Sequence, residues 1–262
     1  MTTTEQVDDL DVGLRAALVR GADALTLAFQ PQVELSTGRL VGLEALVHWD
    51  HPTLGRLQPP DFLTSDRDPA LVAGVGEHVL VRAISQLAAW RTLPGYSRLH
   101  LAVSITATQL RVARRVSEVV NLLDAVGLPA RSLVLEVRED VVLDSGATAA
   151  LLAFAAAGVR VCLDDFGTGA CSLHHLRVLP VSMVKVHRTF VAGLGSRARD
   201  EAIMRAVTSL ACDLGALCVA EGVEHERQLG WLREHDVPLA QGALLHPRLS
   251  APAVTALLRS KV

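Results

Sequence analysis

Aromatic residues are scarce in this sequence and make up 3% of its 262 residues. Proteins that bind single-stranded nucleic acid stack the bases on aromatic side chains, so the scarcity argues against such a surface. The formal net charge is -3, which means that the chain also lacks the excess of basic residues that a polyanion attracts. We therefore expect no DNA or RNA duplex as a partner.

Cysteine is rare as well, and the four cysteines show no CxxC spacing. Cys162, Cys171, Cys212 and Cys218 lie in apolar or mixed surroundings, so we expect reduced packing residues and not zinc ligands. No run of about 18 apolar residues occurs, and the polar, acidic N-terminus does not resemble a signal peptide. These absences predict a cytoplasmic protein without membrane insertion.

Apolar residues are abundant: they make up 50% of the chain, and much of this share is Ala, Val and Leu. A large core is therefore available. The length suits one α/β barrel, which typically has about 250 residues. No linker or low-complexity stretch divides the chain. We expect residues 1–9 to form a frayed N-terminus and residues 10–262 to form a single domain.

The order of the expected elements is that of an α/β barrel. Residues 27–35 and 39–49 have the composition of two strands joined by a Ser-Thr-Gly turn, which makes them antiparallel. A loop over residues 51–63 follows, and then strands alternate with helices, as in a parallel sheet. The further strands are expected at residues 99–105, 133–137, 161–164, 181–186, 217–220 and 239–241. Helices are expected from Leu10 and over residues 70–90, 116–125, 147–157, 202–214 and 226–234. Eight strands predict a TIM-like (β/α)8 barrel with one antiparallel strand near the N-terminus.

Two adjacent aspartates end one of these strands. The apolar run from Val161 stops at Asp164 and Asp165, and a Gly-Thr-Gly loop follows. Neighbouring carboxylates at the end of a buried strand repel each other and lose hydration, so a cation such as Mg²⁺ or Mn²⁺ would explain why they are there. The alternative is a solvated turn in which one of the two caps the next helix.

Other polar residues also fall at or near the ends of different expected strands. They are Glu44, Ser104, Glu136, Lys185, Glu221 and Gln241. Because the strands of a barrel end at one common face, these side chains are expected to converge there with the two aspartates. A structural salt bridge would explain a single carboxylate, but five carboxylates and a lysine at one rim favour a functional site.

Such a rim suits the hydrolysis of a phosphodiester. Several carboxylates can hold one or two divalent cations that polarise the ester and activate a water molecule, and a lysine can stabilise the developing charge. Barrel enzymes that use Mg²⁺ to stabilise an enolate need the same residue types. The chemistry of the residues alone therefore leaves both reactions open.

Several segments together closely resemble the EAL-domain family. They are Phe29-Gln30-Pro31, Glu44-Ala45-Leu46, Trp49 with His51-Pro52-Thr53-Leu54-Gly55, Asp164-Asp165-Phe166-Gly167-Thr168-Gly169, Val184-Lys185-Val186, Ala220-Glu221-Gly222-Val223-Glu224 and Gln241-Gly242. The match runs from about residue 14 to residue 258 in the order of the family. The resemblance implies a bacterial phosphodiesterase that opens c-di-GMP to linear pGpG with Mg²⁺ or Mn²⁺, and it implies a homodimer.

The resemblance also assigns roles to individual residues. The implied metal ligands are Glu44, Ser104, Glu136, Asp164 and Asp165, with Asp165 serving the second of two ions. Lys185 would contact the water or the scissile phosphate, Glu221 would be the general base or the partner of a metal-bound water, and Glu139 would steady the loop over residues 166–172. The implied substrate contacts are Gln30, Leu46, His48 and Gln241, the last at a guanine edge.

Five positions depart from the pattern of the family. Ser104 replaces an asparagine metal ligand, and its shorter hydroxyl is a weaker ligand. His48 replaces an arginine that contacts phosphate, and a neutral imidazole cannot form a bidentate fork. Ser182 and His187 replace aspartates near Lys185, and Ala170 replaces a tyrosine. We therefore expect a phosphodiesterase with reduced activity. The alternative is a degenerate domain that binds c-di-GMP or a protein without hydrolysis, and a regulatory protein partner suits both readings.

Overall fold

A computed structural model describes residues 3–20, 24–64, 67–169 and 173–260. Ala170, Cys171 and the end of the expected loop over residues 166–172 therefore lie outside the described residues.

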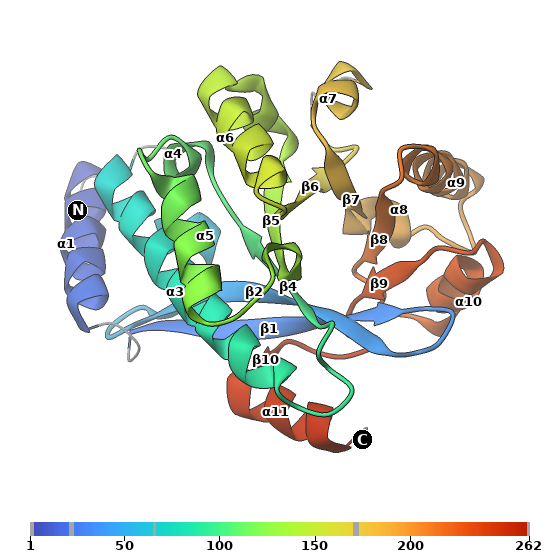
Figure 1. Ribbon diagram of the computed structural model, residues 1–262, viewed down its shortest axis with the longest axis horizontal. Coiled ribbons are helices and arrows are strands. Elements are labelled where there is room, and N and C mark those ends of the chain that lie inside the picture. Colours follow the sequence, from blue (N-terminus) through green and yellow to red (C-terminus); the bar gives the residue numbers. More distant parts are fainter. Residues whose placement is uncertain (1–2, 21–23, 65–66, 170–172, 261–262) are drawn as a thin grey trace.

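Eight strands close into a barrel with helices around it (Figure 1). The strands of the barrel are β1 (Leu25–Glu34), β2 (Leu40–His51), β4 (His100–Ser104), β5 (Leu133–Arg138), β6 (Arg160–Phe166), β7 (Val181–Val186), β8 (Leu217–Glu221) and β9 (Leu239–Gln241). From β2 to β9 the neighbours are parallel, whereas β1 pairs antiparallel with both β2 and β9 and so closes the ring. The predicted barrel with one antiparallel strand near the N-terminus is confirmed.

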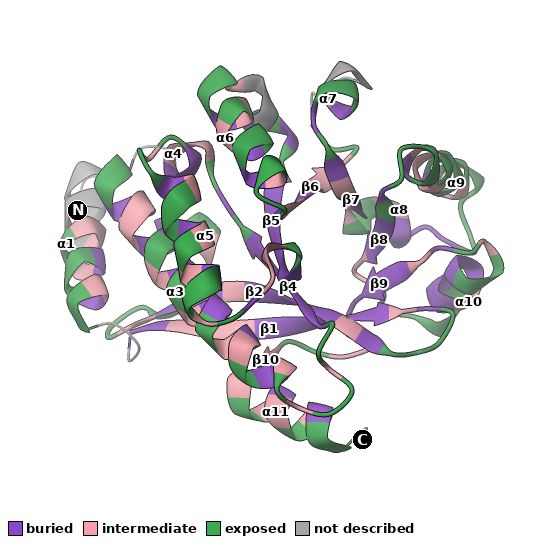
Figure 2. Ribbon diagram, viewed as in Figure 1, coloured by how far each residue is buried: buried purple, intermediate pink, exposed green. Residues whose placement is uncertain are grey.

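The helices cover the outside of the barrel, and their outer faces are exposed while the barrel strands are mostly buried (Figure 2). They are α1 (Thr3–Arg20), α2 (Pro59–Phe62), α3 (Pro69–Arg91), α4 (Ala107–Leu110), α5 (Arg115–Ala125), α6 (Ser145–Ala156), α7 (Leu173–Val178), α8 (Arg188–Val191), α9 (Ala198–Asp213), α10 (Glu226–Glu234) and α11 (Ala251–Ser260). Among the described residues, the short 3-10 helices η2 (Ala130–Ser132) and η3 (Glu139–Leu143) stand before and after β5.

The fold differs from the expectation in several places, and helices α4, α7, α8 and α11 were not predicted. Helix α1 begins at Thr3 and not at Leu10. The expected loop over residues 51–63 contains α2 and a short strand, β3 (Gly55–Leu57), because Gly55 takes a positive φ of 74° and turns the chain back along β2. Strand β10 (Leu249–Ser250) pairs with β1 outside the ring, and two residues are too few to show a strand period.

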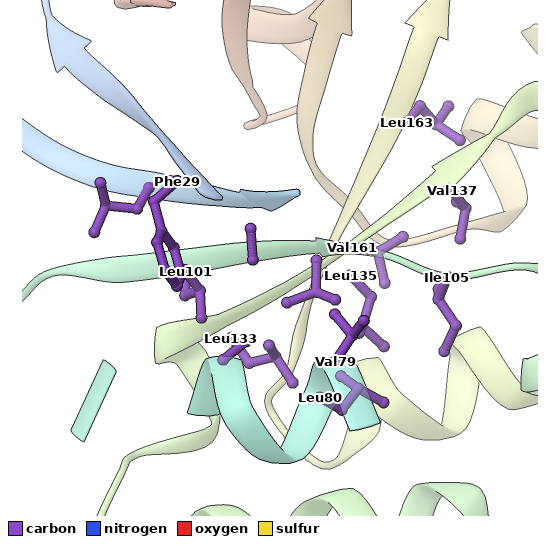
Figure 3. Close-up of a cluster of buried hydrophobic side chains, with 14 of the residues drawn as sticks. Phe29, Val79, Leu80, Leu101, Ile105, Leu133, Leu135, Val137, Val161 and Leu163 are labelled. Carbon is purple, nitrogen blue, oxygen red and sulfur yellow. The ribbon is translucent and has the colours of Figure 1, made fainter. Parts of the chain in front are cut away.

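Two apolar layers position the site. Outward-facing strand residues pack against the helices, and Figure 3 shows Leu133 and Leu135 of the strands near Val79 and Leu80 of α3. A second, smaller layer fills the interior of the barrel. It contains Ala102, Val134, Cys162, Met183, Val219 and Leu239. This interior layer gives a dry base for the polar residues that follow it along each strand.

Helix α3 is long and apolar enough to cross a membrane by length and composition. The helix is not an uninterrupted apolar run, because Glu77, His78 and Arg82 lie within it. Its fully buried residues include Val75 and Ile84, which belong to the main core of the domain. One buried face and one polar face are typical of a core helix.

The cysteines partly follow the prediction. Cys162 and Cys218 are buried and free, as expected for packing residues. Cys212 is also free but exposed on α9, so its assignment as a packing residue was wrong. Its helix has few buried positions, and the apolar residues around Cys212 do not by themselves show which face is covered.

Candidate metal and catalytic site

On most of the strands, the polar side chain of the site lies two residues after a side chain of the interior apolar layer. Side chains two residues apart in a strand point the same way, so Glu136 follows Val134 and Asp164 follows Cys162 into the barrel. Ser104, Lys185, Glu221 and Gln241 follow interior residues in the same manner. The parallel register places Ser104 opposite Glu136. The structure thus brings the expected residues to the carboxyl end of the barrel.

A first acidic cluster contains Glu44, Glu136 and Asp164, and one carboxylate oxygen from each lies within 4.8 Å of the others. Lys185 projects into this cluster from β7. Its Nζ donates hydrogen bonds to Glu44 Oε1 over 2.9 Å and to Glu136 Oε2 over 3.0 Å, and it lies 3.2 Å from Asp164 Oδ1. The lysine side chain is 1% exposed. A single buried ammonium group therefore balances three carboxylates.

This balance sets the protonation of the cluster. Burial disfavours the charged lysine, but the charges of Glu136 and Glu44 outweigh it and raise the pKa of Lys185 well above its usual value. Burial and the charge of Glu44 raise the pKa of Glu136, whereas Lys185 outweighs burial at Glu44 and lowers the pKa of that carboxyl. Burial also raises the pKa of Asp164. Without a metal ion the cluster therefore retains protons, and a divalent cation would release them on binding.

A second acidic cluster contains Asp164, Asp165 and Glu221, also within 4.8 Å. Adjacent residues of a regular strand point to opposite faces, so Asp164 and Asp165 would not share a site without a distortion. The register between β6 and β7 shifts between Leu163 and Phe166, and Asp165 takes a positive φ of 54°. A bulge of this kind redirects a side chain next to a functional site. It turns both carboxylates toward the same space.

The segment after Asp165 is held by Glu139. The backbone N–H of Gly167 donates to Glu139 Oε1 over 2.8 Å, and the hydroxyl of Thr168 donates to the Asp165 carbonyl over 2.8 Å. Gly167 has a φ of 94°, and a Cβ atom at Gly169 would lie 2.6 Å from Glu139 Oε2. The two glycines are therefore required by the backbone conformation and by the close approach of Glu139.

Ser104 borders a cleft beside the first cluster. The cleft has a volume of about 730 Å³, and its lining includes Ser104, Glu136, Asp164, Arg67 and Arg138. The serine is exposed, whereas Glu136 is buried. A ligand in this cleft would therefore have access to the two carboxylates and to the serine hydroxyl.

The four expected substrate-contact residues occupy different environments. Gln241 is 2% exposed, and its Nε2 donates to Glu44 Oε2 over 2.6 Å. The Nε2 of Gln30 donates to the backbone carbonyl of His246 over 2.5 Å. Leu46 is half-buried, and His48 is buried with a pKa lowered first by burial and then by the charge of Arg56. Contact of these residues with a nucleotide stays a prediction.

Sequence reasoning missed three residues near the site. Gln32 donates from Nε2 to Gln241 Oε1 over 2.9 Å, and its own Oε1 lies 2.8 Å from His100 Nε2. The signal for Gln32 was present: it lies two residues after Gln30 in an otherwise apolar strand, so the two share a face. His187, which was noted only as a departure, has its Nε2 3.8 Å from Asp165 Oδ1.

The donor chemistry of the two clusters fits divalent cations. Every ligand atom is a carboxylate oxygen, the donor type that Mg²⁺ and Mn²⁺ prefer, and Asp164 belongs to both clusters. Lys185 shows that the first cluster requires positive charge. The acidic clusters can thus hold metal at the end of the barrel where (β/α)8 proteins carry their active sites. Fold and site define a barrel protein with a candidate metal-dependent active site.

The chain belongs to the EAL domain family, whose model matches residues 13–248. It is 39% identical to the cyclic di-GMP phosphodiesterase NbdA of Pseudomonas aeruginosa over 91% of this chain and 30% of that protein. It is 37% identical to the bifunctional diguanylate cyclase/cyclic di-GMP phosphodiesterase MucR of the same organism, over 88% of this chain and 34% of MucR. The chain thus spans about a third of the length of these relatives.

Solved structures agree with the family assignment. The PaMucR phosphodiesterase in its c-di-GMP complex superposes with a TM-score of 0.85 and 35% identity, over 94% of this chain and 99% of that chain. The EAL domain of Mycobacterium smegmatis DcpA superposes with a TM-score of 0.77 and 32% identity, over 91% of this chain and 97% of that chain.

The stability of the metal-free protein is expected to fall between pH 4.5 and pH 7. Burial and nearby carboxylates, which outweigh Lys185, raise the pKa of Glu221 from 4.5 to about 7. Between these values the folded protein binds more protons than the unfolded chain, so the free energy of unfolding decreases as pH rises. The Glu221 contribution is roughly 2–3 kcal/mol. Urea unfolding at several pH values, in chelator, measures how the free energy of unfolding depends on pH. Glu221→Gln should remove this part of the slope, and the exposed Glu224→Gln should not. Equal slopes in all three proteins would contradict it.

Proposed function

We propose that this chain hydrolyses c-di-GMP to linear pGpG with the help of Mg²⁺ or Mn²⁺, and that the reaction uses two ions. The observation that carries the proposal is the pair of acidic clusters sharing Asp164, with Lys185 placed between three carboxylates. Glu44, Glu136, Asp164 and Asp165 would hold two ions, as two-metal phosphodiesterases require.

 A bound cation would supply Lewis acidity, which neutralises the phosphate and favours deprotonation of a water molecule.

The residues of the chain have defined tasks in this reaction. Water oxygen bonds to phosphorus, the bond from phosphorus to a ribose 3′-oxygen breaks, and that oxygen takes up a proton. Glu221 would accept the proton of the water, because its carboxylate lies beside Asp164 and Asp165 in the second acidic cluster. Lys185 stabilises the negative charge that develops on the phosphate and positions Glu44 and Glu136. Glu139 holds the segment that carries Asp165 through its hydrogen bond to Gly167.

A second candidate function is binding of c-di-GMP without hydrolysis. Ser104 and His48 favour it, because a serine hydroxyl and a neutral, buried imidazole hold metal and phosphate less tightly than the asparagine and arginine of the family pattern.

The two functions differ in turnover. Chromatography of c-di-GMP after incubation with the purified chain and Mg²⁺ or Mn²⁺ should show pGpG. Saturable binding without any pGpG, at high enzyme concentration and with both metals, would favour the receptor function.

Restoring the family residues is expected to increase turnover. Ser104→Asn adds a longer oxygen ligand at the cleft beside Glu136 and Asp164, and His48→Arg adds a bidentate phosphate donor. Each change should raise kcat/KM by roughly tenfold, because one charge-assisted contact contributes about 1.5–3 kcal/mol and part of that is lost in ordering the new side chain. The measurement is the rate of pGpG formation. Thr106→Asn, in the same cleft, is the control for Ser104→Asn. Unchanged turnover in both restored variants would contradict impaired metal and phosphate binding.

The remaining assignments follow from this proposed activity. A cytoplasmic location suits a protein that acts on an intracellular dinucleotide, and the apolar helix α3 is accounted for by the core. We include in the proposal a homodimer and a regulatory protein partner. Size-exclusion chromatography with light scattering tests the dimer, and it should report twice the mass of one 28.0 kDa chain.

A further inference from the structure

The opposite end of the barrel carries a pocket lined by basic residues. Its volume is about 560 Å³, and it lies where β4, β5 and β6 begin, on the face away from the acidic clusters. The lining consists of Arg91, Ser97, Arg98, His100, Arg131, Ser132 and Arg160. We call it the arginine pocket. Four guanidinium groups surround it, and its lining has no aspartate or glutamate.

The charge of the arginine pocket is not balanced by the protein. Within the described part of the chain, none of these four arginines forms an ion pair with a carboxylate. The Arg91 side chain donates to the backbone carbonyl of Leu99 over 3.3 Å, and to no other group among the described residues. Arg160 is half-buried, and its Nε is buried without a hydrogen-bond partner among the described residues. A buried donor without a partner is costly, so it marks a place where an acceptor is expected.

The arginines are close enough to repel one another. Burial lowers the pKa of Arg91, and the charge of Arg131 lowers it further. Burial also lowers the pKa of Arg160, with a further contribution from Arg91. On the inner side, His100 is 5% exposed, and burial together with Arg160 lowers its pKa to about 3, so its ring is neutral. Like charges held together in a partly dry pocket are stabilised when an anion binds between them.

The size of the pocket and the number of arginines indicate the ligand class. We propose that the arginine pocket binds a small ligand with two or more adjacent phosphate groups, such as a diphosphate or the polyphosphate chain of a nucleotide. Two guanidinium forks can hold one phosphate group, so four arginines suit a second phosphate group beside the first. The exposed hydroxyl of Ser97 lines the same pocket and can donate to a further phosphate oxygen, whereas the Ser132 hydroxyl is buried and already donates to the Pro129 carbonyl over 2.7 Å. A nucleic-acid backbone would instead need basic side chains spread along an open surface.

Isothermal titration calorimetry in chelator tests the proposal. Without divalent cations the acidic clusters at the other end repel polyanions, so binding reports the arginine pocket and is independent of hydrolysis. The probes are inorganic pyrophosphate and ATP, each titrated into the full chain. The test variant is Arg98→Ala/Arg131→Ala, in which both side chains are exposed at the pocket. The matched control is Arg199→Ala/Arg259→Ala, which removes the same charge from exposed positions elsewhere.

We expect saturable binding of one pyrophosphate per chain, weakened at least about tenfold in Arg98→Ala/Arg131→Ala and by less than about twofold in the control. Equal affinity for ATP and pyrophosphate would mean that the pocket recognises the phosphate groups alone. Tighter binding of ATP would mean that its ligand is a nucleotide. Both results support the site. Unchanged thermal unfolding of the variants confirms that they fold. Absence of saturable binding, or an equal loss in both double variants, would overturn the proposal.

Discussion

Replacing Lys185 with methionine is expected to abolish hydrolysis and to make the stability of the chain depend on a divalent cation. The lysine is 1% exposed and contacts Glu44, Glu136 and Asp164 within 3.2 Å. Methionine keeps much of the side-chain volume but removes the charge, so the three buried carboxyl groups lose the positive charge that balances them. Breaking a buried ion pair by removing one partner destabilises a protein by about 3–5 kcal/mol.

The measurement for this variant is thermal unfolding in chelator and in Mn²⁺. In chelator, Lys185→Met should unfold well below the unmodified chain. In Mn²⁺, the ion replaces the missing positive charge, so the variant should recover more of its stability than the unmodified chain gains. Arg199→Met removes an exposed positive charge and is the matched control, with little expected change. Equal stability of Lys185→Met and the unmodified chain in chelator would contradict the role of Lys185 as the balancing charge.

Replacing Glu44 with glutamine is expected to reduce the rate of pGpG formation by at least about a hundredfold. Glu44 accepts hydrogen bonds from Lys185 and Gln241 and belongs to the first acidic cluster. Glutamine has the same shape, but it removes one negative charge and replaces one oxygen with an amide nitrogen. The variant therefore loses a metal ligand while the barrel stays intact.

The control for Glu44→Gln is Glu118→Gln, which makes the same chemical change at an exposed position of α5. Rates should be compared at saturating Mn²⁺ and c-di-GMP, so that weaker binding does not hide the effect on turnover. Circular dichroism should give the same spectrum for all three proteins. Turnover by Glu44→Gln within about threefold of the unmodified chain would show that Glu44 is not a metal ligand in the reaction.

The barrel and much of its acidic rim could be predicted from local pattern. Parallel strands end at one face, so Glu136 and Glu221 could be placed together without knowing any distance. Glu44 lies in a longer strand, β2, and its place followed from the resemblance to the family as much as from the pattern. The antiparallel orientation of β1 could be predicted because a three-residue turn joins it to β2.

Other features depend on contacts that no local pattern contains. The bulge at Asp164 and Asp165 comes from the register of β6 against β7, and it decides that both side chains reach one site. The arginine pocket is built from the end of α3 and the beginnings of three strands, where each arginine alone looks like an ordinary solvated residue. The position of Lys185 within hydrogen-bonding distance of Glu44 likewise depends on how the barrel closes.

A crystal structure of the chain with Mn²⁺ and c-di-GMP, with anomalous scattering data, tests the central claim most directly. We expect an anomalous peak among the carboxylate oxygens of Glu44, Glu136 and Asp164, with Lys185 Nζ moved away from at least one of them. A second peak is expected between Asp164 and Asp165. Bound c-di-GMP without any anomalous peak, and with Lys185 still in contact with all three carboxylates, would contradict the assignment of this rim as a metal centre.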